Sequence, residues 1–293
     1  MPTVTRPRRS MLYMPGSNPR ALEKARGLAA DALIFDLEDA VSPDAKEAAR
    51  GVISEALAAG GYGKRELILR TNGLDTPWGH GDLTAAAKMP VHGVLLPKVE
   101  SAATVRQAAA ILEKAGAPAE LAIWCMMETP MGMLRAEEIA GSHPRLAGFV
   151  MGTSDLANDL HARHTRDRLP LLTGLGLCLL AARAYGLAIL DGVYLDLSDD
   201  EGFAYSCRQG VELGFDGKTL IHPKTIATAN EAFAPSAAEI EQAKRFIAAF
   251  DAAEAEGKGV VLVDGKLVEN LHVANARRLL ALVARIAELE AGS

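Results

Sequence analysis

The sequence predicts an α/β protein, a (β/α)8 TIM barrel with a small C-terminal appendage of helices and a hairpin. Short apolar runs alternate with longer stretches of helical periodicity over about 235 residues, the usual size of such a barrel. Several runs are apolar on successive residues, as in Leu33-Ile34-Phe35, which is typical of parallel strands covered on both faces. A doubly wound sheet is the alternative, but no Gly-x-Gly-x-x-Gly follows the first strand.

The apolar runs and the helical periodicity alternate in a fixed order along the chain. Strands are expected at Ser10–Met14, Ala32–Asp36, Glu66–Thr71, Gly93–Pro97, Leu121–Met127, Leu146–Gly152, Ala188–Asp191 and Phe215–Ile221. Helices are expected between them, with examples at Ala21–Ala29, Ala45–Ala59, Ala102–Ala115, Leu171–Ala184, Glu201–Leu213 and Pro223–Phe233. The active site of such a barrel lies at the C-terminal ends of its strands.

The chain changes organisation after residue 235, which divides it into a catalytic barrel over 1–235 and an appendage over 236–293. Ser236 and Glu239 form a capping-box pattern at the start of the appendage. Its expected elements are a charged helix over Ser236–Glu256, a strand over Val260–Val263, a hairpin turn at Asp264-Gly265 and a final helix over about His272–Leu289. The appendage is too small to hold its own core, so we expect it to pack on the barrel or on a neighbouring subunit.

Composition and cysteine usage exclude several classes of protein. The net charge of -6 argues against a nucleic-acid partner, which calls for a basic face. No stretch approaches the roughly 20 apolar residues of a membrane span, and the basic opening over Met1–Ser10 is broken too soon for a signal peptide. Cys125, Cys178 and Cys207 are an odd, scattered set that fits neither disulfides nor zinc. We expect buried thiols in a cytoplasmic protein.

Charged residues follow the expected strands repeatedly at the same end. They are Asp36, Glu38 and Asp39 at the end of the second strand, Arg70 at the end of the third, Lys98 after the fourth, Glu128 after the fifth and Asp155 after the sixth. Burying such groups singly is expensive, so we expect them to be paired, bound to a metal or hydrated.

Glu128 and Asp155 follow neighbouring strands, which would bring both carboxylates within reach of one cation. Two carboxylates with room for water suit Mg²⁺, with Mn²⁺ as a second choice, and the absence of a nearby His cluster argues against zinc. The alternative is that each carboxylate only caps the helix that follows it. The presence of Arg70 favours the metal site.

Arg70 has the planar fork that binds a carboxylate through two hydrogen bonds. Beside a metal it would hold an α-keto acid or the matching hydroxy acid. The alternative is an ion pair with a residue of the cluster over Asp36–Asp39, and both roles can coexist. We expect this cluster to orient metal-bound waters and Arg70.

The first loop carries a separate signal. Asn18 is the expected N-cap of a helix that begins at Pro19, and a helix start of this kind binds anions. Arg20 and Lys24 share one face of that helix, and Tyr13 precedes them at the strand end. A phosphorylated ligand tail would explain this set; a solvated basic face is the alternative.

At these residues the chain resembles the HpcH/HpaI aldolase and citrate-lyase superfamily, in particular its branch of citrate lyase β-subunit-like and malyl-CoA or citramalyl-CoA lyases. The resemblance spans almost the whole chain in one order, and it indicates the branch but not the substrate. The stretches that carry it are Arg9-Ser10-Met11-Leu12-Tyr13-Met14-Pro15-Gly16, Asp36-Leu37-Glu38-Asp39-Ala40-Val41, Arg70-Thr71-Asn72, Leu96-Pro97-Lys98, Met127-Glu128-Thr129-Pro130, Gly152-Thr153-Ser154-Asp155-Leu156 and Gly217-Lys218-Thr219-Leu220-Ile221-His222-Pro223.

The resemblance implies a TIM barrel in a homo-oligomer, a trimer or a hexamer, with Mg²⁺ held by Glu128 and Asp155. Arg70 matches the substrate-binding arginine of the family, and Glu128 also faces the substrate there. The positions that match contacts to the CoA thioester are Tyr13, Arg20, Lys24, Ile221 and His222.

One turn departs from the family pattern. Relatives typically carry an aspartate in a Met-Ile-Asp-x-Pro turn near the C-terminus, which reaches across a subunit boundary as an acid or base. Here the stretch reads Leu267-Val268-Glu269-Asn270-Leu271, so Glu269 keeps a carboxylate on a longer stem and the proline is missing. The expected catalytic set is Arg70, Glu128, Glu269 and Asp39.

The expected activity is a Mg²⁺-dependent carbon–carbon lyase acting on a CoA thioester. It would cleave or form malyl-, methylmalyl- or citramalyl-CoA, releasing glyoxylate or pyruvate with acetyl- or propionyl-CoA. The alternatives are a hydroxyacyl-CoA thioesterase on the same site, a citrate lyase β subunit acting on an acyl-carrier-protein thioester, and a pyruvate aldolase that uses His80 or His161. One methyl group changes binding by only about 1–3 kcal/mol, so the acyl group stays open.

Overall fold

The computed structural model describes residues 6–292, which form two compact units. The larger unit is Arg8–Phe233, and the smaller one comprises 6–7 and Ala234–Gly292. The domain limits and the packing partner of the appendage stay predictions.

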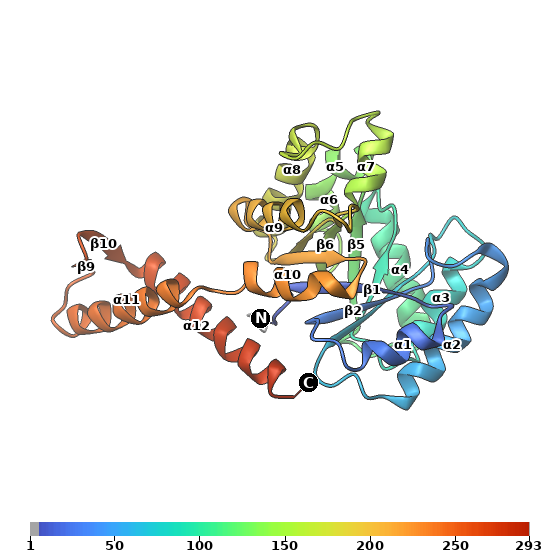
Figure 1. Ribbon diagram of the computed structural model, residues 1–293, viewed down its shortest axis with the longest axis horizontal. Helices are drawn as coiled ribbons and strands as arrows, with labels where there is room; N and C mark the ends of the chain where they lie inside the picture. Colours follow the sequence, from blue (N-terminus) through green and yellow to red (C-terminus); the bar gives the residue numbers. More distant parts are fainter. Residues whose placement is uncertain (1–5, 293) are drawn as a thin grey trace. The chain divides into compact units, whose positions relative to one another are not determined.

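The larger unit is a closed barrel of eight parallel strands in chain order, in which β1 pairs with both β2 and β8 (Figure 1). The predicted TIM-barrel fold is confirmed. The strands are β1 Ser10–Pro15, β2 Ala32–Asp36, β3 Glu66–Arg70, β4 Gly93–Leu96, β5 Ala122–Met127, β6 Leu146–Met151, β7 Ala188–Asp191 and β8 Gly217–Leu220.

Helices follow the strands and surround the barrel (Figure 1). They are α1 Pro19–Ala25, α2 Lys46–Ala59, α3 Gly79–Ala86, α4 Ala102–Lys114, α5 Pro130–Leu134, α6 Ala136–Ala140, α7 Thr153–Asp159, α8 Leu172–Ala184, α9 Asp200–Leu213 and α10 Ile226–Ala232, with 3-10 turns η1 Pro43–Ala45, η2 Leu169–Leu171 and η3 Pro223–Thr225. Helices α3, α5, α6 and α7 lie outside the ranges expected from the sequence. They have 5 to 8 residues, too few to show a clear helical period. The predicted cap is present, since Asn18 accepts a hydrogen bond from the N–H of Ala21.

Each strand is buried on both faces, which explains its uninterrupted apolar run. In β3, Ile68 belongs to the cluster inside the barrel, whereas Leu67 and Leu69 pack between the strands and the helices. A sheet covered on both faces cannot show the alternation of polar and apolar residues that marks a half-exposed strand.

Trp124 fills the barrel interior, and two glycines make room for it. It is fully buried and pairs with Gly148 on β6, and a Cβ at Gly93 on β4 would lie 3.0 Å from its ring. A Cβ on Gly148 would lie 2.3 Å from the Trp124 ring and 2.7 Å from the carbonyl oxygen of Ala188. The guanidinium of Arg8 lies 4.8 Å from the centroid of the same ring. The interior is therefore a packed core, which leaves only the strand ends open for a site.

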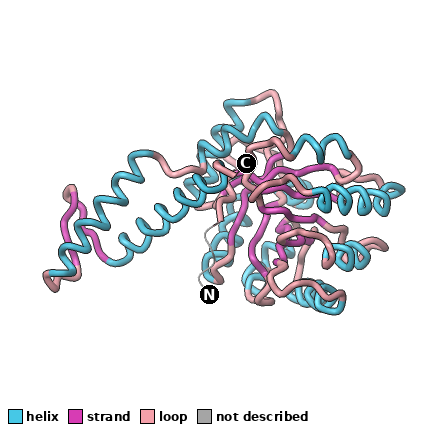
Figure 2. Tube along the Cα trace, turned by 90° about the horizontal axis from the view of Figure 1, so that it is seen from below, coloured by secondary structure: helices cyan, strands magenta, loops and turns pink. Residues whose placement is uncertain are grey.

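The smaller unit is a helix pair with a two-stranded hairpin between them (Figure 2). Its elements are α11 Ala237–Ala255, β9 Val260–Val263, β10 Lys266–Glu269 and α12 Asn270–Glu290. The predicted hairpin turn is confirmed, with φ of 50° at Asp264 and 76° at Gly265, and so is the capping box of Ser236 and Glu239.

The expectation that the appendage holds no core of its own is wrong. Phe250, Val268 and Val273 are buried together, and Val261 and Val263 pack against them. One face of the hairpin closes over the helix pair, an arrangement that periodicity within single elements does not reveal.

The three cysteines are free and buried, as predicted. Burial raises the pKa of Cys178 to about 12 and that of Cys207 to about 11, so both remain protonated thiols. Within residues 6–292, no helix combines the length and apolar character required to cross a membrane.

Gly148→Ala tests the packing of the barrel interior. The added methyl group would collide with Trp124 and the backbone of β7, so we expect the free energy of unfolding to fall by about 1–3 kcal/mol in urea denaturation. The matched control is Gly51→Ala in α2, where a Cβ meets no atom within 4 Å. That change should be neutral or stabilise the helix by about 0.5–1 kcal/mol. Equal stability of Gly148→Ala and the wild type would contradict this account of the core.

Candidate active site

A cavity of about 440 Å³ opens at the C-terminal ends of the barrel strands, the end that the sequence indicates. It is bounded by residues at or just beyond strand ends. They are Tyr13, Pro15, Asp36, Asp39, Ala40, Arg70, Met126, Glu128, Met151, Gly152, Thr153, Ser154, Asp155, Val193, Thr219 and Ile221.

The side of the cavity formed by β2 and β3 is held by an ion pair between Asp36 and Arg70. The two residues are direct neighbours in the register of the parallel pair. Nε of Arg70 donates to Oδ1 of Asp36 at 2.7 Å, and Nη2 donates to Oδ2 at 2.6 Å. Both side chains are buried, so the pair is a charge-assisted, two-point contact largely shielded from water.

The remaining terminal nitrogen of Arg70 contacts two more carboxylates. Nη1 lies 2.8 Å from Glu38 and 3.2 Å from Asp39. The ring of Tyr13 lies beneath the guanidinium, whose central carbon is 4.8 Å from the ring centroid. The predicted ion pairing of Arg70 is therefore present with all three acidic residues of the cluster.

Glu38 and Asp39 are adjacent carboxylates that shift the pKa of one another in opposite directions. Burial and the neighbouring Asp39 raise the pKa of Glu38 to about 7, although Arg70 opposes the shift. Burial acts to raise the pKa of Asp39 as well, but the hydrogen bond from Glu38 and the charge of Arg70 hold it below its usual value. The pair can therefore hold or release one proton near neutral pH.

The opposite carboxylate, Glu128, is held in the cavity by the backbone. Oε1 of Glu128 accepts a hydrogen bond from the N–H of Lys98 at 2.8 Å. A Cβ at Gly152 would lie 2.4 Å from Oε2, so only glycine at this position leaves room for the carboxylate. Burial and the negative charge of Asp155 raise the pKa of Glu128 to about 7.

Asp155 lies in the first turn of α7 and lines the same cavity. Its side chain is 41% exposed, and one carboxylate oxygen lies 3.7 Å from Nζ of Lys98. The structure therefore brings Glu128 and Asp155 to one cavity, as the order of the strands predicts.

The donor set of this cavity fits a hard cation. Among the described residues, five carboxylates gather here, and the cationic side chains that pair with them are those of Arg70 and Lys98. The carboxylates are Asp36, Glu38, Asp39, Glu128 and Asp155. Among residues 6–292, no group of three or more His, Cys, Asp or Glu side chains is placed to hold a metal by itself. Glu128 and Asp155 could hold an ion that keeps several waters or substrate oxygens, the preference of Mg²⁺.

The other predicted site residues fall into two groups. Tyr13, Asp39 and Ile221 line the cavity. Arg20 and Lys24 are exposed on α1 and do not line it.

His222 and Glu269 both serve as helix caps. Nδ1 of His222 accepts a hydrogen bond from the N–H of Lys224 at 3.1 Å, at the start of η3. Glu269, in the smaller unit, is the N-cap of α12 and forms a capping box with His272. Capping explains the imidazole of His222, whereas the catalytic role expected of Glu269 stays a prediction.

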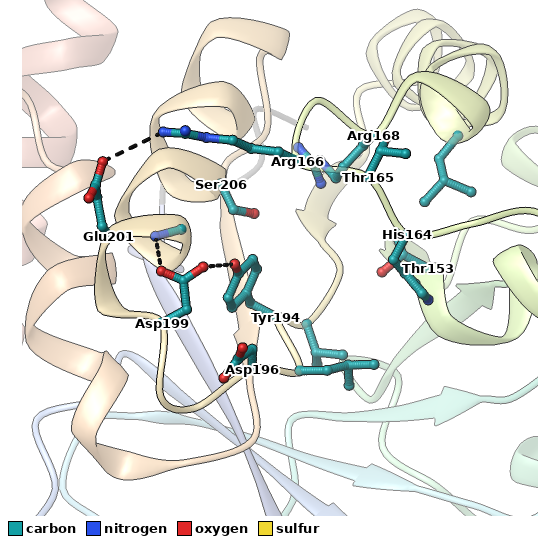
Figure 3. Close-up of a pocket in the computed structure, with 14 residues that line it drawn as sticks. Thr153, His164, Thr165, Arg166, Arg168, Tyr194, Asp196, Asp199, Glu201 and Ser206 are labelled. Atoms are coloured by element: carbon teal, nitrogen blue, oxygen red, sulfur yellow. Dashed lines mark hydrogen bonds and ion pairs between the residues drawn. The ribbon is translucent and has the colours of Figure 1, made fainter.

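A second polar cavity of about 430 Å³ adjoins the first and shares Thr153 and Val193 with it (Figure 3). In its wall, the hydroxyl of Tyr194 donates to Asp199 at 2.6 Å. Arg168 is anchored behind it, since Nη1 lies 2.6 Å from the fully buried Asp191. No residue of the predicted catalytic or metal set lines this cavity.

Lys98 is expected at a strand end, but the sequence assigns it no role. The structure puts its backbone against Glu128 and its ammonium near Asp155. Its position after an apolar strand was the signal in the sequence that could have indicated a role in the site. The left-handed backbone of Lys98, with φ of 49°, was not predictable from that pattern.

Similarity to known proteins extends over nearly the whole chain. The family model described as HpcH/HpaI aldolase/citrate lyase matches residues 9–223. The chain is 55% identical over 285 residues to a protein of Cereibacter sphaeroides named (3S)-malyl-CoA thioesterase, covering 97% of this chain and 98% of that one. It is 36% identical over 310 residues to L-malyl-CoA/beta-methylmalyl-CoA lyase of the same species, covering 97% and 96%. The solved structure of the protein CitE from Mycobacterium tuberculosis in complex with magnesium, acetoacetate and coenzyme A matches with a TM-score of 0.75 at 30% identity, covering 94% and 97%.

Arg70→Met tests the ion cluster. Without the guanidinium, the buried carboxylate of Asp36 loses its partner, and we expect the free energy of unfolding at pH 7 to fall by about 3–5 kcal/mol. Asp39→Asn is the control, because the Asp39 side chain is 65% exposed and its pairing should contribute less than about 1 kcal/mol. Urea denaturation of both variants gives the comparison. Similar losses in the two would show that the Asp36 contact is not the dominant one.

Proposed function

The chain belongs to the HpcH/HpaI aldolase/citrate lyase family, and from this premise we propose that it is a Mg²⁺-dependent enzyme that hydrolyses a 3-hydroxyacyl-CoA thioester of the malyl-CoA type. The observation that carries the proposal is the cavity at the strand ends, which Glu128 and Asp155 share with the Arg70 cluster. From the sequence alone, carbon–carbon cleavage is the expected reaction and hydrolysis the alternative. The 55% identity to a thioesterase, against 36% to a lyase, favours hydrolysis.

Glu128 and Asp155 would hold the Mg²⁺ ion, with the remaining positions left to water and substrate oxygens. When bound, Mg²⁺ supplies positive charge that attracts the acyl carboxylate and hydroxyl and polarises the oxygens it contacts. The magnesium and coenzyme A in the CitE complex support both groups as ligands of this family.

Arg70 would complete the recognition of the acyl carboxylate. Its contacts with Asp36 lock the plane of the guanidinium, so Nη1 is the nitrogen left for substrate. The contact of Nη1 with Asp39 is 3.2 Å long and largely exposed, which makes it the one that a substrate carboxylate would replace.

Hydrolysis then requires one proton to be taken up and returned. The Glu38–Asp39 pair would accept a proton from water at the edge of the cavity, since the pKa of Glu38 is raised to about 7. The water oxygen bonds to the thioester carbonyl carbon, the carbon–sulfur bond breaks, and the departing CoA thiolate receives the proton. The products are the free hydroxy acid and CoA.

The thioester tail would leave the cavity past Tyr13 and Ile221, which line it. Arg20 and Lys24 are exposed on α1, where they would meet the phosphates of CoA. This placement rests on the family resemblance and on the charge of both side chains.

Carbon–carbon cleavage makes one chemical demand that hydrolysis does not. A lyase must return a proton to the carbon of the enolate that it forms, and Glu269 was the expected acid. Glu269 begins α12, and its role as that acid stays a prediction. Hydrolysis requires no carbon acid. The carrier-protein and pyruvate-aldolase alternatives, and the trimer or hexamer, stay predictions.

A product assay separates the two reactions. Purified enzyme with Mg²⁺ is offered malyl-, methylmalyl- and citramalyl-CoA, and free thiol and keto acid are measured separately. We expect free CoA and intact hydroxy acid in equal amounts, with activity abolished by a chelator. Keto acid and acetyl- or propionyl-CoA, without free CoA, would identify a lyase instead.

Cation binding should depend on pH through Glu128. Its raised pKa, about 7 in the metal-free protein, means that below pH 7 the ion must displace a proton. Calorimetric titration with Mg²⁺ should therefore show affinity that falls up to about tenfold per unit as the pH drops from 7 to 5 and levels off above pH 8. Glu128→Gln should bind more weakly and lose this dependence. A pH-independent affinity in the wild type would remove Glu128 from the cation site.

A further inference from the structure

Lys98 contacts both of the carboxylates that the proposed function assigns to the cation, and it does so through different groups. Its backbone N–H donates to Oε1 of Glu128 at 2.8 Å. Its ammonium nitrogen lies 3.7 Å from Oδ2 of Asp155. Lys98, which follows β4, therefore links a carboxylate that follows β5 with another that follows β6.

The backbone contact depends on an unusual conformation. Lys98 has φ of 49°, in the left-handed region that residues with a Cβ seldom adopt. The N–H of the following residue, Val99, donates to the carbonyl of Met126 in β5. This local turn aims the N–H of Lys98 at Glu128, so the orientation of that carboxylate does not depend on the lysine side chain.

The side chain contributes charge at the rim of the cavity. The side chain is 58% exposed. Burial acts to lower the pKa of Lys98, but the negative charges of the nearby carboxylates outweigh it and raise that pKa. These carboxylates are Asp155, Glu38, Glu128 and Asp39. A flexible, partly exposed ammonium near Asp155 offsets the repulsion between the carboxylates. The same positive charge repels any cation that approaches them.

We propose that Lys98 is a positioning residue that sets the affinity of this site for a divalent cation. Its backbone N–H orients Glu128, and its ammonium pairs with Asp155 until the cation displaces it. The ammonium thereby weakens cation binding and keeps the ion exchangeable. This inference rests on the cation site of the proposed function, but not on whether the reaction is hydrolysis or carbon–carbon cleavage.

The test is calorimetric titration of the full chain with Mg²⁺ at pH 8 in the absence of substrate. Lys98→Met keeps the backbone N–H and removes the charge, so we expect Mg²⁺ to bind about three- to tenfold more tightly. Lys98→Gly also keeps the N–H, suits the left-handed backbone and should show the same gain. Lys98→Arg keeps the charge and should stay within about twofold of the wild type. The gain in Lys98→Met should shrink as NaCl is raised, because salt screens charges near the surface.

Three outcomes would overturn the proposal. Unchanged or weaker binding in Lys98→Met would show that the ammonium does not oppose the cation. Tighter binding in Lys98→Arg, equal to that in Lys98→Met, would trace the effect to the shape of the side chain rather than its charge. A wild type that binds no Mg²⁺ at all would remove the cation site itself, and with it the proposed function, which distinguishes that failure from the first two.

Discussion

The site depends on the pairing of Asp36 with Arg70 across β2 and β3. The parallel register places the two residues side by side, and their two hydrogen bonds fix the plane of the guanidinium. That plane determines where the remaining nitrogen points, and hence where Glu38 and Asp39 lie. Because both partners are buried, neither can be lost without leaving a charge in the protein interior. The rigid barrel beneath them, filled by Trp124, keeps this geometry in place.

An excess of negative charge governs the rest of the cavity. The raised pKa values of Glu38 and Glu128 express the cost of gathering carboxylates away from water. A proton, the ammonium of Lys98 or a divalent ion can each reduce that cost. Gly152 matters for the same reason, since its missing side chain admits the carboxylate of Glu128 to the cavity. The cation exchange that we propose for this site would follow from the same excess of negative charge.

Carbon–carbon cleavage and thioester hydrolysis make the same first demands on this site. Both require a bound acyl carboxylate, a polarised oxygen and a group that accepts a proton. The two reactions differ in their later steps, because a lyase must protonate a carbon and a thioesterase must admit water. The family relatives include both activities, with the thioesterase 55% identical and the lyase 36% identical to this chain. The charged cluster would thus serve either reaction. Access of water to the thioester and the presence of an acid that protonates carbon would distinguish hydrolysis from carbon–carbon cleavage.

The sequence alone determined the barrel, the end at which the site lies and the acidic and basic residues gathered there. These features arise from apolar runs and strand order, which depend on neighbours along the chain. The short helices α5, α6 and α7 were not predicted from the sequence, because 5 to 7 residues are too few to show helical periodicity. Only the tertiary structure decided that Arg70 binds three carboxylates, that Lys98 reaches Glu128 and Asp155, and that Glu269 caps a helix. Contacts of that kind depend on register and backbone dihedral angles between distant segments, which no pattern along the chain records.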